Sequence, residues 1–206
     1  MFAVGHLALG YLIGKTSSKV LGTKVKTSFI LMLAILPDVD LLIPFIKHRG
    51  PTHSLITTTI ALTLTYLLIG KKAIPYGITY LQHIIPGDYI AGGGIQLLWP
   101  LNTHWYSLAK PITKISIHVE VIAFLISLPL LWKTKDLKQL FHPQTSNLTL
   151  LIPLGALTTP LLLKFPVEVP PELILPHLIL IALLLTVIIN DSKHQINKLS
   201  LKLQTK

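Results

Sequence analysis

The sequence predicts an all-α, multi-pass membrane protein: a bundle of about six spanning helices preceded by a short N-terminal helix. Of its 206 residues, 51% are hydrophobic and 13% are charged, whereas soluble domains carry about 25% charged residues. The apolar residues gather in long runs, and lipid accepts such runs as helices because every backbone group must be paired within the segment. We expect residues 1–206 to form one membrane domain, with polar motifs in 1–100 and further hydrophobic helices in 101–206.

The individual elements follow from the apolar runs and their boundaries. Residues 2–14 are apolar but too few for a full span, so they predict a buried or tilted helix. Each later run is bounded by lysine, proline, glycine or asparagine, residues that flank or end membrane helices. The six predicted spans are 27–46, 54–70, 74–99, 115–132, 148–163 and 172–190.

The net charge of +10 comes mainly from lysines at the ends of these runs. Cationic flanks hold spans against the cytoplasmic face of a membrane. We therefore expect an integral inner or plasma membrane protein in contact with lipids, and no nucleic-acid partner. The lysine-rich segments 15–26, 71–72, 133–138 and 193–206 are then cytoplasmic, and 47–53, 100–114 and 164–171 lie outside. Lys110 and Lys114 count against this orientation.

Several ionisable residues interrupt the apolar runs of the N-terminal half. Three aspartates occur in "LPDVDLL" and "HIIPGDYI", and each costs about 2.5–3.5 kcal/mol at a helix centre unless it is paired or bound to a metal. Histidines accompany them, and the chain has no cysteine. Imidazoles and carboxylates suit zinc, with Mn²⁺ or Mg²⁺ as alternatives. The predicted metal ligands are His6, Asp38, Asp40, His48, His53, His83 and Asp88.

The local sequence around "PDVD" and "HRGPTHS" suggests different roles within this set. Asp38 and Asp40 are two residues apart and would face opposite ways on a regular helix, so we expect one ligand and one supporting or bridging group. Gly50-Pro51 predicts a turn, and His53 then falls in the first turn of a helix, where the imidazole stays neutral. Arg49 is the expected fork for a phosphate group, and an aspartate of "PDVD" is the expected general base.

Four stretches of the chain resemble the LexA-regulated, membrane-bound, metal-dependent hydrolase family (YdjM-like). They are "GHLALG", "LPDVDLL", "HRGPTHSL" and "YLQHIIPGDYIAGGGIQLLWP", and their order and spacing agree over about residues 3–100. "HRGPTHSL" is the most specific of them. Residues 101–206 resemble the family only as hydrophobic spans. The resemblance implies an inner-membrane hydrolase.

The same motif order is remotely similar to zinc-dependent phospholipase C and related nucleases, all-helical enzymes with a metal cluster. Carried over, this similarity implicates His6, Asp38 or Asp40, His53, His83 and Asp88 as ligands, and it favours phosphoester chemistry. The family usually spaces its last pair four residues apart, whereas His83 and Asp88 are five apart. Five residues turn a regular helix about 140° away from a shared face. Either the helix bulges or breaks near Pro86, or a ligand is lost.

The leading hypothesis is a membrane enzyme that hydrolyses phosphoesters, with a lipid-like substrate, by means of metal-activated water. Its alternative is a metal or ion transporter that uses the same histidines and aspartates without hydrolysis, since acids within membranes also line ion pathways. A third interpretation, in which the polar residues only hold helices together, requires three costly acids for contacts worth about 0.6 kcal/mol each.

Overall fold

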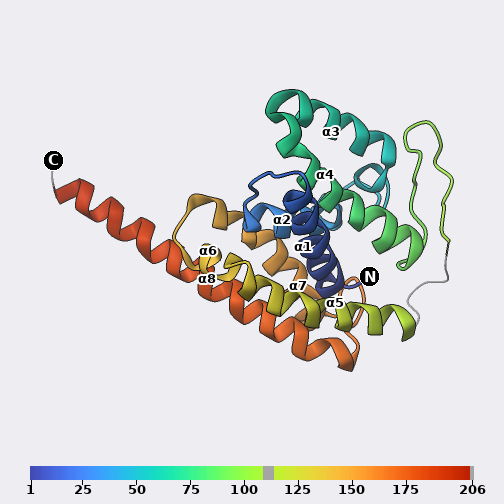
Figure 1. Cartoon of the computed structure of the whole chain (residues 1–206). Helices are drawn as coiled ribbons and strands as arrows, with labels where there is room; N and C mark the ends of the chain where they lie inside the picture. Colours follow the sequence, from blue (N-terminus) through green and yellow to red (C-terminus); the bar gives the residue numbers. More distant parts are fainter. Residues whose placement is uncertain (109–113, 205–206) are drawn as a thin grey trace.

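The computed structural model describes residues 1–108 and 114–204, and its regular elements are helices joined by loops (Figure 1). Within the described residues no strand is formed, and Ile95 and Tyr106 make one isolated antiparallel bridge. Lys110, assigned to an external loop by the sequence analysis, lies outside the described residues. The α-helices are α1 (Ala3–Val20), α2 (Thr27–Ile35), α3 (Leu55–Ile69), α4 (Ala73–Gln82), α5 (Lys114–Lys133), α6 (Asp136–Phe141), α7 (Leu151–Leu163) and α8 (Pro171–Gln204). The remaining helical segments are 3₁₀ turns at Leu36–Leu42, Pro51–His53, Gly70–Lys72 and Thr145–Leu150, and a π-helix at His83–Ile90.

Helix α1 is the central helix of the fold, and it is longer than predicted. The run 2–14 predicted a short helix, but the helix continues through Lys15 and Lys19 to Val20, and ten of its eighteen residues are buried. It packs against α2, α4 and α5 (Figure 1). Small residues allow this close packing, because a Cβ on Gly10 or Gly14 would collide with α2 or α4.

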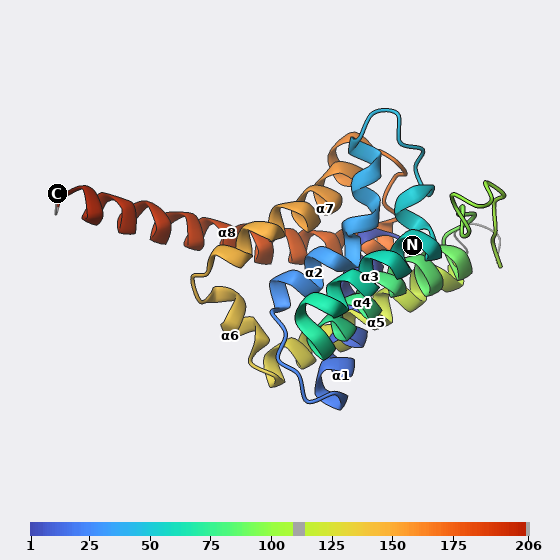
Figure 2. The ribbon, with the colours of Figure 1, turned by 90° about the horizontal axis from the view of Figure 1, so that it is seen from above.

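Three helical stretches of the described chain are long and apolar enough to cross a membrane, namely Ser116–Lys133, Thr145–Leu163 and Pro171–Lys198. Only 33% of an apolar 18-residue segment within each stretch is buried, and large apolar side chains such as Ile122, Leu125 and Leu175 are exposed along them. Such a surface suits lipid rather than water. Figures 1 and 2 show that α8 continues past the other helices toward the C-terminus.

The three earlier runs form shorter or irregular helices, so the prediction of six spans is confirmed only for the three later ones. The run 27–46 loses its regular helix at Ile35, because Pro37 starts a 3₁₀ turn. The run 54–70 gives the 15-residue α3, which ends at Gly70 in a left-handed conformation. The run 74–99 gives the ten-residue α4, followed by the π-helix.

The lysine-rich segments 15–26 and 133–138 are in contact at one end of the molecule. Lys15 pairs with Asp136 across 2.5 Å, and the backbone amide of Lys26 donates to the hydroxyl of Tyr76 near the start of α4. Asn190, just before the C-terminal lysines, donates to the carbonyl of Phe141. The contacts of Lys26 and Asn190 bring residues next to the segments 71–72 and 193–206 close to this end, but the C-terminal part of α8 projects away from the other helices (Figures 1 and 2). The placement of all four lysine-rich segments on one face of the membrane stays a prediction.

Candidate metal centre

The two aspartates of "PDVD" point in different directions because the chain there forms a 3₁₀ turn. A 3₁₀ helix has three residues per turn, so side chains two positions apart diverge by about 120°. The side chain of Asp38 is 25% exposed and reaches the rings of His53 and His83. The side chain of Asp40 is fully buried and reaches the loop that contains "HRGPTHS". The sequence analysis left open which aspartate is the ligand, and this geometry favours Asp38.

The "HRGPTHS" loop wraps around the carboxylate of Asp40. The backbone amide of Arg49 donates to Oδ2 at 3.0 Å, and the hydroxyl of Thr52 donates to the same oxygen at 2.6 Å. Nδ1 of His48 lies 2.8 Å from Oδ1. Arg49 has a left-handed backbone, with φ of 63°, which turns the chain so that these donors converge. A buried carboxylate with several donors is stable without its water shell, and it fixes the loop that presents His53.

A π-helix brings His83 and Asp88 to the same face despite their spacing of five residues. The segment His83–Ile90 forms hydrogen bonds between residues five apart, and Pro86 lies inside it. Residues i and i+5 therefore stack along one side, as residues i and i+4 do on an α-helix. Of the two outcomes that the spacing left open, the helix bulges and both side chains point inward. Gly87 permits the bulge, because a Cβ there would collide with the ring of His6.

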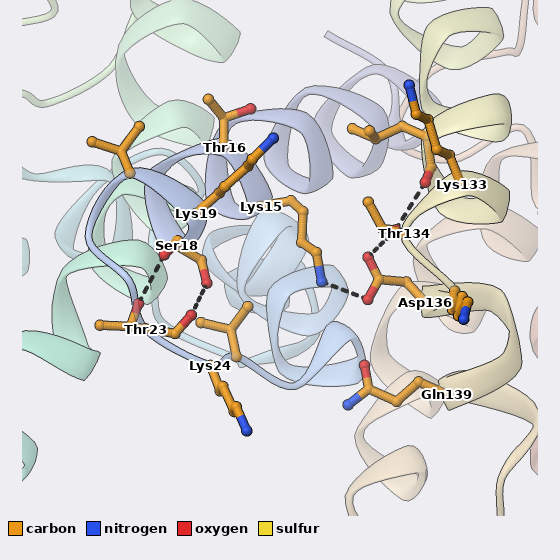
Figure 3. Close-up of a pocket in the computed structure, with 14 residues that line it drawn as sticks. Lys15, Thr16, Ser18, Lys19, Thr23, Lys24, Lys133, Thr134, Asp136 and Gln139 are labelled. Carbon is orange, nitrogen blue, oxygen red and sulfur yellow. Dashed lines mark hydrogen bonds and ion pairs between the residues drawn. The ribbon is translucent and has the colours of Figure 1, made fainter.

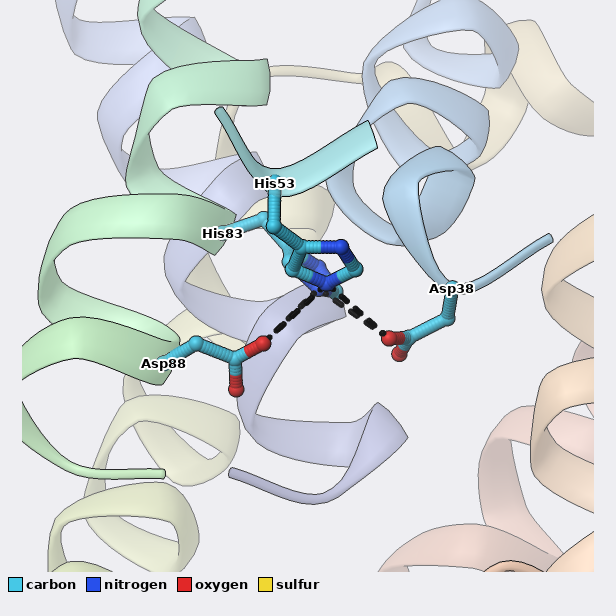
Figure 4. Close-up of side chains that lie close together, drawn as sticks. All are labelled: Asp38, His53, His83 and Asp88. Carbon is cyan, nitrogen blue, oxygen red and sulfur yellow. Dashed lines mark ion pairs between the residues drawn. The ribbon is translucent and has the colours of Figure 1, made fainter. Parts of the chain in front are cut away.

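Four side chains from three separate segments converge at this position (Figure 4), namely Asp38, His53, His83 and Asp88. Nε2 of His53 lies 3.5 Å from Oδ1 of Asp38 and 3.2 Å from Oδ2 of Asp88. Nε2 of His83 lies 3.3 Å and 3.7 Å from the same two oxygens. Ligand atoms about 2.0–2.2 Å from a tetrahedral ion lie roughly 3.3–3.6 Å from one another. The four imidazole–carboxylate distances are therefore close to those between ligands of one small ion, and all four donor atoms lie within 4.8 Å of one another.

The hydrogen bonds around the two histidines leave both Nε2 atoms free to act as ligands. Nδ1 of His83 lies 2.9 Å from the carbonyl oxygen of Ala34, so Nδ1 carries the proton. Nδ1 of His53 lies 2.9 Å from the hydroxyl of Thr52, which itself donates to Asp40. His53 is thus held by a carboxylate through one hydroxyl, the arrangement typical of metal-bound imidazoles. Both Nε2 atoms and Oδ2 of Asp88 are buried and make no hydrogen bond within the described structure.

The electrostatics of the group favour a positive charge. Burial lowers the pKa of His53, but Asp38, Asp40 and Asp88 together raise it well above its ordinary value. The neutral imidazole expected from a helix N-terminus is therefore not found, because His53 lies in a 3₁₀ turn before α3 and beside three carboxylates. The carboxylates that would stabilise a proton on this imidazole would also stabilise a divalent cation. The guanidinium of Arg49 donates to Oδ1 of Asp88 at 3.0 Å and to the carbonyl of Gly92 at 3.0 Å. Arg49 therefore orients Asp88 and leaves its other oxygen facing the centre.

Of the three remaining predicted ligands, Asp40 is enclosed by the "HRGPTHS" loop, and His6 and His48 lie beside this group. The ring of His6 stacks on that of His83 with 3.7 Å between centroids, and its Nε2 is 3.9 Å from Oδ1 of Asp88. His48 belongs to a second group of donors with Asp40 and His53. All seven predicted residues thus lie together, but only Asp38, His53, His83 and Asp88 form the group of four converging donor atoms.

Glu120 is a buried acid whose role the sequence analysis did not identify. It projects from α5 and accepts the backbone amides of Phe2 and Gly5 at 3.1 and 3.2 Å. These amides belong to the first turn of α1, where the helix dipole favours a negative charge. Glu120 therefore holds the N-terminus of α1 beside the metal-ligand group. The signal that singled out the aspartates, an acid inside an apolar run, was present here as well.

The fold and the site together define an all-helical integral membrane protein with histidine and aspartate groups that could hold a metal ion. A comparison with protein families then matches residues 1–194 to the family described as YdjM inner membrane protein. The chain belongs to this family and is an inner-membrane protein. The match includes the C-terminal half, which the sequence motifs did not cover. Neither the curated proteins nor the solved structures contain a match.

Proposed function

We propose that this protein is a metal-dependent hydrolase of phosphoesters, with Asp38, His53, His83 and Asp88 as the ligands of a divalent ion. The supporting observation is the spacing of the four donor atoms, 3.2–3.7 Å between each imidazole nitrogen and each carboxylate oxygen. Two imidazoles and two carboxylates at tetrahedral spacing fit zinc, and Mn²⁺ or Mg²⁺ are the alternatives. The bound ion would supply a polarised water and a Lewis acid for the phosphoester.

The contacts of Asp38, Asp40 and Arg49 favour a different role for each of these residues. Asp38 is the most exposed of the four ligands, so it is the aspartate best placed to accept a proton from attacking water. Asp40 already accepts from Arg49 and Thr52, which favours a role in positioning His53. Arg49 was expected to bind phosphate, but its contacts with Asp88 and Gly92 favour a positioning role for it too.

A lipid-like substrate fits the surroundings of the site. Helix α3 follows directly after His53 and has a single buried residue, Thr58, whereas Leu64, Leu67 and Leu68 are exposed on it. We propose that α3 also lies in lipid, as do the irregular helices α2 and α4, which would complete the six membrane segments expected from the sequence. A phosphoester in the headgroup layer would then reach the site from the exposed side of Asp38.

Elemental analysis of protein purified in neutral detergent tests the metal assignment. We expect close to one equivalent of a divalent metal in the wild type, and loss of it in His83→Ala. His104→Ala is the matched control, because His104 is exposed and contacts Tyr106 outside the group, and it should retain the metal. Equal metal contents in the wild type and in His83→Ala would contradict the assignment.

A second measurement separates hydrolysis from transport. The metal-loaded wild type is incubated with phospholipids and soluble phosphodiesters, and phosphate-containing products are quantified with and without chelator. Chelator-sensitive hydrolysis that Asp38→Asn abolishes supports the enzyme. Uptake of radiolabelled metal into proteoliposomes along its gradient, with no product from any phosphoester, would support the transporter instead.

A further inference from the structure

A cavity of about 780 Å³ lies at the lysine-rich end of the molecule. It is bounded by the C-terminal turn of α1, the connection from α1 to α2, the end of α5 and the start of α6 (Figure 3). Five lysines line it, and we call it the lysine pocket: Lys15, Lys19, Lys24, Lys133 and Lys135. Hydroxyl and amide groups of Thr16, Ser18, Thr23, Thr134 and Gln139 line the same space. The lining therefore combines positive charge with neutral hydrogen-bonding groups.

The single acid of the lysine pocket is already neutralised. Asp136 pairs with Lys15 and accepts from the hydroxyl of Thr134 (Figure 3). It also accepts from the hydroxyl of Tyr11. The other four lysines are exposed and form no ion pair within the described structure. The pocket thus has a surplus of positive charge, which favours an anionic ligand.

The lysine pocket lies where a membrane surface is expected. The apolar stretch of α5 ends at Lys133, and the neighbouring Trp132 is 76% exposed, as is typical of aromatic residues at the lipid–water boundary. The pocket is also far from the metal-ligand group. His6 and Lys19 are thirteen residues apart on α1, a distance of about 20 Å along a helix. It is therefore a separate site at the opposite end of the central helix.

We propose that the lysine pocket binds the phosphate group of an anion, with the headgroup of an anionic phospholipid and a soluble phosphate as the two possible sources. Ammonium groups bind phosphate as point charges, and basic pockets at the cytoplasmic ends of membrane helices bind anionic headgroups. The rival explanation is that these lysines only flank their helices. That explanation predicts that lysines inside and outside the pocket contribute equally to the binding of an anionic phospholipid.

Native mass spectrometry of the full-length protein in neutral detergent tests the proposal. Phosphatidylglycerol is titrated against the wild type, with phosphatidylcholine as the zwitterionic reference. The pocket variant replaces three exposed lysines, Lys19→Gln, Lys24→Gln and Lys133→Gln. Since each lysine near an anionic surface contributes on the order of a fivefold change in binding, we expect the affinity for phosphatidylglycerol to fall roughly tenfold or more.

The matched control removes the same charge from lysines at this end that do not line the pocket, Lys71→Gln, Lys72→Gln and Lys138→Gln. It should keep its affinity to within about twofold, because screened charges outside the pocket contribute little. Equal losses in both variants, or no loss in either, would overturn the proposal. If the pocket variant fails to fold, the single change Lys24→Gln in the exposed connection provides the same comparison.

Competition identifies the source of the phosphate. Inorganic phosphate that displaces phosphatidylglycerol from the wild type, but does not bind the pocket variant, supports a soluble anion. Binding of phosphatidylglycerol that inorganic phosphate does not displace supports a lipid headgroup. If the wild type binds neither phosphatidylglycerol above phosphatidylcholine nor inorganic phosphate, the proposal is wrong. These outcomes do not depend on metal content, so the lysine pocket and the hydrolase proposal fail separately.

Discussion

Replacing each aspartate of "PDVD" by asparagine should separate a ligand from the residue that supports it. Asp38 faces the centre, so Asp38→Asn removes the negative charge of one of the two carboxylate donors. Asp40 faces the loop, where Arg49 and Thr52 donate to it and His48 lies within hydrogen-bonding distance. The side chain introduced by Asp40→Asn would lack the charge and would turn an NH₂ group toward one of these donors. The two isosteric changes should therefore affect different properties.

The magnitudes follow from these contacts. Hydrogen bonds to a charged group contribute about 1.5–3 kcal/mol each, so the loss of at least one and the weakening of the others should destabilise the metal-free Asp40→Asn protein by roughly 2–4 kcal/mol. For a chain of this size, that corresponds to a decrease in Tm of about 5–15 °C. Its metal affinity should fall by about 10–100-fold, since His53 loses its supporting carboxylate. Asp38→Asn should lose more metal affinity and less metal-free stability.

The assay combines thermal unfolding in neutral detergent, with excess chelator, and a metal titration of each variant. The expected result is a crossed pattern, with the larger loss of stability in Asp40→Asn and the larger loss of affinity in Asp38→Asn. The reverse pattern would refute our assignment of the two aspartates. A metal-free Asp40→Asn protein as stable as the wild type would show that the contacts of the "HRGPTHS" loop with this carboxylate do not hold the site together.

Three further variants probe the supports of the site. Gly87→Ala should lower the stability measured by thermal unfolding by about 1–3 kcal/mol, because the added methyl group collides with His6. The control Gly155→Ala places its methyl group in open space and should be neutral or stabilising. Equal effects of the two changes on stability would refute the collision. Glu120→Gln should cost about 1–2 kcal/mol by weakening the N-terminus of α1, and an unchanged Tm would contradict that role. Arg49→Lys should weaken metal binding by about tenfold at unchanged stoichiometry, and isothermal titration with an unchanged affinity would exclude the positioning role.

The residues that form the candidate site were predictable from the sequence, but the directions in which their side chains point were not. Acids and histidines inside apolar runs identified all seven residues that the structure brings together. Which aspartate faces the centre depends on the 3₁₀ turn Leu36–Leu42, which has Pro37 in its first turn, and a regular helix would have oriented both differently. The inward direction of Asp88 depends on the π-helix. Sequence periodicity assumes one helix type throughout, so it is uninformative at these two positions.

The membrane helices were predictable where apolar runs are uninterrupted. The three later runs give helices of spanning length, since no residue in them breaks the helix completely. The earlier runs contain Pro37, Gly70 and the bulge at Pro86, and regular helices end near each of them. The run of residues 2–14 predicted a buried or tilted helix, and α1 is buried against α2, α4 and α5, but its continuation to Val20 was not predicted.

The π-helix also bears on how sites of this kind can be recognised in other chains. A search that requires a fixed gap of three residues between the histidine and the aspartate would pass over this protein, although both side chains project to the same side of their helix. One inserted residue is absorbed by a wider turn, because a glycine leaves room for it against the neighbouring imidazole. A pattern that admits either gap, with a small residue required for the longer one, would describe the constraint better than a residue count.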